Sequence, residues 1–300
     1  MFAVPGILLL VALLYLRPQE LIPALRELPL LPVFLGLAIF GFAVDLKLRK
    51  SRLMLTPQLG WVALFFGFCP GVGLSISIPI IVYVVIGHGV QTFRALEAVT
   101  GTLLAAVLVR CLCESDPALQ DPNELALTLF IALPFAFAFF KRKRSATRLL
   151  LALVATVLVG YRSAKLLEPH SGFGVGAGQR VLAELGFPGL VLFSVVLYVS
   201  VKIPVRAIKC LRALGPEADV ARAWAVGLLA SLGGLVVGSL FVPVFYDPVL
   251  WIYVGLSGAF FCAMKRHDPE YAVRFGWRDC SLVIAIDALL IGIGFVSTLP

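Results

Sequence analysis

The chain has 300 residues, of which 60% are hydrophobic and 14% are charged, and its formal net charge is +8. A soluble domain of this composition has too little polar surface to cover its core, so a soluble globular protein is excluded. The positive charge lies in short segments between apolar runs, which is typical of a membrane protein and gives no support for a nucleic-acid partner.

Apolar runs repeat along the whole chain, and a helix needs about 20 apolar residues to cross a bilayer. We therefore predict an all-α fold, a polytopic transmembrane helical bundle with about eleven spans in a range of about ten to twelve. Residues 1–300 form a single integral membrane domain. The predicted spans are 3–16, 29–44, 59–75, 78–92, 96–112, 124–140, 147–161, 188–205, 223–243, 248–264 and 280–298.

The positions of the charges predict the orientation of these spans. With a cytoplasmic N-terminus, nineteen of the 25 basic residues fall in inner loops or at inner helix ends, as the positive-inside rule requires. These inner segments suit anionic membrane lipids as partners. The six basic residues left on the outer side are Arg17, Arg26, Arg110, Arg162, Lys165 and Arg180.

The segment "DPNE" at 121–124 has the pattern of a helix start. Asp121 suits the N-cap position, and Pro122 suits the first helical position because its missing N–H is not needed there. The segment "FCPGVGLSIS" at 68–77 has the opposite character, since Pro70 and its neighbouring glycines kink or break a helix. The sequence thus predicts a new helix at 122 and an interruption near 70.

The long outer loop at 162–188 contains the glycine-rich segment "FGVGAGQRVLAELGFPG". Its second half predicts a short helix at the membrane surface, with Gly186 as C-cap and Pro188 preventing a simple continuation. Arg180 and Glu184 are four residues apart and can pair on the polar side of that helix. From the residues alone, a solvated surface helix without a further role remains the alternative.

Six cysteines and three histidines show no spacing typical of a metal site. We therefore predict no metal and no cofactor.

Three segments resemble, in the same order, parts of the bacterial O-antigen ligase and O-antigen polymerase family. "RPQELIPALRELPLL" at 17–31 is similar to the N-terminal hairpin of many members. "DPNELALTLFIALPFAFAF" at 121–139 is similar to their mid-chain helix. "RVLAELGFPGLVLFSVVLY" at 180–198 resembles the segment that follows their large periplasmic loop. The hydrophobic helix pairs after residue 220 also suit the family's C-terminal helices, so that together the resemblance extends over most of the chain.

The resemblance implies a glycosyltransferase of the bacterial inner (cytoplasmic) membrane that needs neither a metal nor a nucleotide sugar. Family members take a glycan from an undecaprenyl diphosphate carrier at the periplasmic face. They join it to a glycan, lipid or protein acceptor: the lipid A core in ligases, another carrier-linked repeat in polymerases.

The outer face supplies residues for this chemistry. Arg162 lies near the position of a family arginine at the outer membrane boundary, and Arg180 and Arg110 add positive charge; guanidinium groups suit phosphate oxygens. His170 and Glu184 are the candidates for a catalytic base. Relatives usually have an Ala-His-Asn-like motif just before the "LAELG" helix, where this chain has "GVGAG", so the resemblance points to the upstream His170 as the loop histidine.

Two other functions stay open. The missing motif favours a non-catalytic or degenerate paralogue that binds a lipid-linked glycan or a partner enzyme. The interruption near residue 70 is compatible with a membrane transporter, because transporters bind solutes at broken helices.

Overall fold

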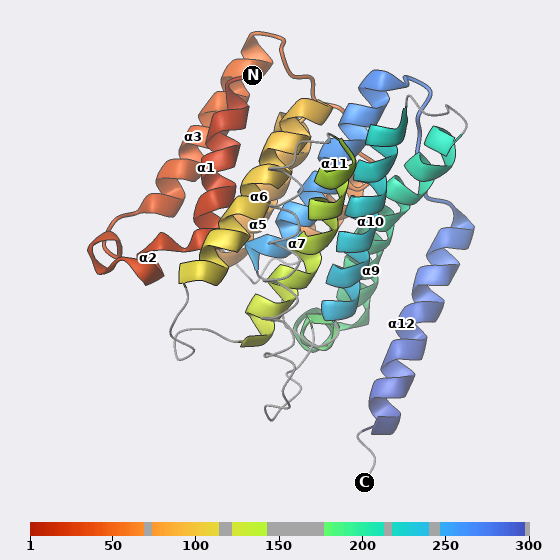
Figure 1. The fold of residues 1–300 in the computed structure, drawn as a ribbon. Coiled ribbons are helices and arrows are strands. Elements are labelled where there is room, and N and C mark those ends of the chain that lie inside the picture. Colours follow the sequence, from red (N-terminus) through yellow and green to blue (C-terminus); the bar gives the residue numbers. More distant parts are fainter. Residues whose placement is uncertain (69–73, 114–121, 143–176, 213–217, 240–246, 298–300) are drawn as a thin grey trace.

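The computed structural model describes residues 1–68, 74–113, 122–142, 177–212, 218–239 and 247–297. All regular structure in these ranges is helical, which confirms the predicted all-α class. In chain order the elements are α1 (Ala3–Leu16), α2 (Pro18–Leu21), a 3-10 turn η1 (Pro23–Leu25), α3 (Leu30–Lys47), α4 (Leu59–Gly67), α5 (Leu74–Gly89), α6 (Phe93–Cys113), α7 (Pro122–Arg142), α9 (Ala177–Arg212), α10 (Asp219–Gly238), α11 (Pro248–His267) and α12 (Trp277–Ser297) (Figure 1).

Four described helices are long and apolar enough to cross a membrane: α3, α10, α11 and the 181–212 part of α9. Two further helical segments are apolar but shorter, α1 and the 77–89 part of α5. This is the character of a helical membrane protein. The predicted span at 147–161 lies outside the described residues.

Helix α11 forms the centre of the bundle. Every residue from Val249 to Met264 is buried, and α5, α9, α1, α6 and α10 all pack against α11. Helix α11 packs most extensively against α5, where a side chain added at Gly255 would meet Ile86 at 3.1 Å and one added at Gly87 would meet the Gly255 carbonyl oxygen at 3.5 Å. Small residues at this crossing therefore let the two backbones come together, as in many membrane bundles.

The basic segments that the structure describes gather at the end of the bundle that holds the N-terminus (Figure 1). Arg266 donates a hydrogen bond to the Lys50 carbonyl oxygen at 3.3 Å, and the Arg52 N–H donates to Gln91 Oε1 at 3.2 Å. We call this the basic end. At the opposite end α1 finishes and α11 begins (Figure 1), and we call it the pocket end.

Residues 51–58 run from the basic end alongside α5 and α11 without forming a helix. His88 Nε2 lies 3.1 Å from the Met54 carbonyl oxygen, and Thr56 shares a hydrogen bond of 2.9 Å with the Tyr83 hydroxyl. Gln58 then donates to the Val254 carbonyl oxygen at 2.9 Å. These contacts provide hydrogen-bond partners for backbone and side-chain groups that would find none in the apolar interior.

Helix α4 consequently starts inside the bundle, and because it ends at Gly67 it has nine residues. Such a helix covers about 13 Å, far less than the hydrocarbon layer. The predicted span at 59–75 therefore differs from the observed helix: the helix ends at Gly67, and α5 begins separately at Leu74. The predicted interruption between them falls mostly outside the described residues.

Helix α9 has a sharp break at Gly186, whose φ of 67° and ψ of −173° are not helical. Positive φ suits glycine because it has no Cβ. The predicted end of a short helix at this glycine is confirmed, and the chain continues beyond Pro188 as the long apolar part of α9.

Helix α12 is held to α9 near the basic end by one carboxylate. Asp279 accepts hydrogen bonds from Lys202 Nζ at 2.6 Å, from the Tyr198 hydroxyl at 2.7 Å and from the Gly276 N–H at 2.7 Å. Lys202 also donates to the Arg274 carbonyl oxygen at 2.9 Å. The link thus ties the first turn of α12 and the segment before it to α9.

Acidification is expected to loosen this link. Burial opposes the ionisation of Asp279, but the hydrogen bonds from Lys202, the Gly276 N–H and Tyr198 outweigh it and lower the pKa of Asp279 to about 2. An unfolded aspartate titrates near about 3.9, so the stabilisation is present above about pH 4 and is lost as the pH falls toward 2.

Hydrogen exchange in the first turns of α12, corrected for the intrinsic rate, should therefore rise in the wild type as the pH falls from about 5 to about 2. Asp279→Asn should exchange fast throughout that range. Wild-type exchange that does not change with pH would contradict the expectation.

Candidate functional site

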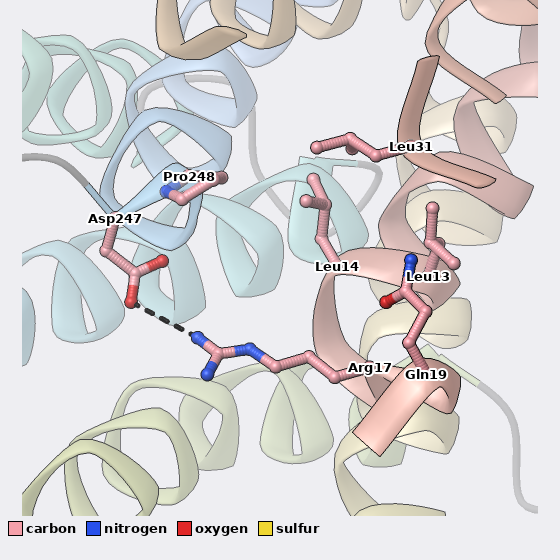
Figure 2. A pocket seen from close by; sticks show the side chains of 7 residues that line it. All are labelled: Leu13, Leu14, Arg17, Gln19, Leu31, Asp247 and Pro248. Carbon is pink, nitrogen blue, oxygen red and sulfur yellow. Dashed lines mark ion pairs between the residues drawn. The ribbon is translucent and has the colours of Figure 1, made fainter. Parts of the chain in front are cut away.

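Helix α1 ends at a residue with an uncommon backbone conformation. Arg17 has φ 43° and ψ 55°, in the left-handed region, and its N–H donates to the Leu13 carbonyl oxygen at 3.0 Å. Pro18 then starts α2, because proline suits the first turn of a helix. The turn carries the Arg17 side chain away from α1 and toward the start of α11 (Figure 2).

A pocket of about 200 Å³ opens at this position. Arg17 reaches across it toward Asp247, and the two charged groups are 3.8 Å apart, measured from Nη2 to Oδ2 (Figure 2). Leucines make up much of the rest of the wall, so the pocket combines an ion pair with apolar surface. The lining residues are Leu13, Leu14, Arg17, Gln19, Leu31, Asp247 and Pro248.

Asp247 is fixed by its position as the N-cap of α11. Its Oδ1 accepts a hydrogen bond from the Val249 N–H at 2.8 Å, and Pro248 occupies the first helical position. Burial raises the pKa of Asp247, while the Val249 N–H and the charges of Arg17 and Arg110 act in the opposite direction. The result is a carboxylate that takes up a proton more readily than an exposed aspartate does.

A buried polar layer lies next to this ion pair. Arg110, which is 3% exposed, donates from Nη1 to the Tyr15 carbonyl oxygen at 3.1 Å. The hydroxyls of Tyr15 and Tyr253 are close enough to interact with each other, yet neither completes a regular hydrogen bond within the described part of the chain. Helices α1, α6 and α11 thus each bring a polar side chain to the interior behind Asp247.

Within the described part of the chain, the structure does not bring the predicted site residues together in one site. Arg110 lies near the Arg17–Asp247 pair and interacts electrostatically with Asp247, but its side chain is inside the bundle. Glu184 is exposed on α9 before the break at Gly186. Arg180 lies on the same helix, and both Arg162 and His170 lie outside the described residues.

Comparison with known protein families, with curated proteins and with solved structures finds no match for this chain. Its site is therefore interpreted from its own geometry. Within the described ranges, no three histidine, cysteine, aspartate or glutamate side chains gather as metal ligands do.

The sequence placed Arg17 among the outer basic residues but assigned neither Arg17 nor Asp247 to a site. Asp247 stands before a proline and a long apolar run, the same signal that predicted the helix start at Pro122. That signal identifies a cap, however, and not a partner 230 positions away. Only the packing of α1 against α11 brings the two charges together.

Proposed function

We propose that the protein transfers a glycan from an undecaprenyl diphosphate carrier to an acceptor at the periplasmic face of the bacterial inner membrane, as a ligase or polymerase of the O-antigen type. The resemblance of three segments to that family supports the reaction. The Arg17–Asp247 pocket carries the proposal, because it offers charge and apolar surface side by side where a membrane helix begins.

The proposed topology has about eleven spans and a cytoplasmic N-terminus. The gathering of basic segments at the end that holds the N-terminus supports this orientation. The pocket end then faces the periplasm, and the proposed loop at 162–188 with its surface helix lies on the same side.

The chemistry follows from the residue types. A diphosphate needs fixed positive charge, which Arg17 supplies in the pocket and Arg110 supplies behind it. Arg162 and Arg180 would add phosphate contacts from the loop, with His170 or Glu184 as base. The leucine wall suits the isoprenoid chain of the carrier, since apolar surface binds apolar surface.

The test uses the purified full chain in liposomes with a fluorescent undecaprenyl diphosphate-linked disaccharide, with ligase and polymerase acceptors offered separately. Arg17→Ala should lower transfer about 10- to 100-fold, because a hydrogen bond to a charged group contributes about 1.5–3 kcal/mol. Arg26→Ala is the matched control, since Arg26 lies exposed in the same hairpin and outside the pocket. Equal transfer by the two variants would exclude the pocket as the site.

The same liposomes separate the alternatives. Carrier binding without transfer to any acceptor would establish the non-catalytic relative. A transporter is the second candidate, and the non-helical segment at 51–58 before the short helix α4 favours it. To detect transport, a quencher is added outside the liposomes. The fraction of fluorescent carrier that it quenches shows how much carrier has moved between the leaflets.

A further inference from the structure

We infer that Asp247 is the group that accepts the proton of the attacking acceptor hydroxyl. The inference rests on the proposed function and assigns a role that the sequence analysis gave to His170 or Glu184. It comes from the position of the carboxylate at the start of α11.

The geometry of Asp247 suits this role. The hydrogen bond from the Val249 N–H holds Oδ1, while Oδ2 faces Arg17 across the pocket at 3.8 Å. The carboxylate is the N-cap of the most buried helix of the described bundle, so its position is fixed by the packing of that helix. A proton acceptor held on a rigid element beside a binding pocket has little freedom to lose when the substrate arrives.

The surrounding charges explain how a bound ligand would change the proton affinity of the Asp247 carboxylate. Arg17 at the end of α1 and Arg110 on α6 stabilise its ionised form, and the hydroxyls of Tyr15 and Tyr253 lie behind it. From α3 the pocket wall receives only the apolar Leu31. A diphosphate that engages Arg17 neutralises part of this positive charge, and the carboxylate then holds a proton more strongly.

The transfer step balances with this assignment. The acceptor hydroxyl oxygen forms a bond to the anomeric carbon of the glycan, and the bond from that carbon to the phosphate oxygen breaks. Its electron pair leaves with undecaprenyl diphosphate, and the hydroxyl proton passes to Oδ2 of Asp247. The carboxyl group returns the proton to water before the next cycle.

The experiment measures transfer and carrier binding by the full chain in liposomes, with the fluorescent undecaprenyl diphosphate-linked disaccharide, from about pH 5 to 8. Asp247→Asn keeps a side-chain acceptor for the Val249 N–H. We expect it to lower transfer about 100-fold, to remove the rise of the rate with pH, and to leave carrier binding within about threefold. Asp247→Glu should recover part of the rate and the pH dependence.

Asp219→Asn is the matched control, because Asp219 is an exposed aspartate in the first turn of α10 at the basic end. His170→Ala and Glu184→Gln complete the set, and a loss confined to one of them would transfer the role to that residue. Transfer by Asp247→Asn within about threefold of wild type overturns the inference alone. Absence of transfer by wild type with every acceptor overturns the proposed function and this inference with it.

Discussion

Gly41→Leu is expected to lower the free energy of unfolding by about 3 kcal/mol, because it forces apart two helices whose backbones touch. A Cβ atom at Gly41 would lie 2.5 Å from the Phe2 carbonyl oxygen, and one at Gly6 would lie 2.8 Å from the Ala38 Cα. Backbone atoms cannot rotate aside as side chains do. The shift would also pull Asp45 from the Ala3 N–H, to which it is bonded at 2.8 Å.

Gly36→Leu is the control for this variant. Gly36 lies on the same helix, α3, but is exposed, and a Cβ there meets nothing within 4 Å. Chemical denaturation in detergent micelles should therefore separate the two variants, with only Gly41→Leu showing the loss. Equal loss in both would mean that leucine in α3 is harmful for reasons other than the contact with α1.

Trp251→Ala is expected to cost about 3–5 kcal/mol, the usual range for removing a large aromatic side chain from a packed core. Trp251 is fully buried, and its ring centroid lies 4.7 Å from that of Phe66 and 6.1 Å from that of Phe65. It stands one turn after Asp247, so the cavity left behind would also loosen the wall of the pocket.

The measurement again is denaturation in micelles, now combined with carrier binding, and both should fall in this variant. Trp277→Ala provides the comparison, since Trp277 is 87% exposed at the start of α12. A Trp251→Ala protein that keeps wild-type stability would show that α4 and α11 repack around the missing ring.

Local signals in the sequence predict local features well. The helix start at Pro122 and the break at Gly186 are both confirmed, because proline and glycine act through their own backbone geometry. The apolar runs likewise predict α3, α10 and α11, which are long enough and apolar enough to cross a membrane.

Long-range features were not predictable in the same way. The path of residues 51–58 before α4 leaves no periodic signal, because it depends on the buried partners that Thr56 and Gln58 find on α5 and α11. The Arg17–Asp247 contact joins residues 230 positions apart, and this pairing likewise leaves no local signal. Arg110 was named from its charge near the outer end of a span, and its burial behind the pocket comes from tertiary packing.

The contact between Gln58 and the Val254 carbonyl oxygen links residues 196 positions apart, and this has a consequence for synthesis. At about 5–20 residues per second, roughly ten seconds or more pass before the ribosome has made the partner of Gln58. During that time α4 is too short to cross a bilayer by itself, and it has α5 and later α9 to pack against. The nascent chain therefore keeps α4 in a provisional position, and the arrival of α11 is the event that completes the first quarter of the protein.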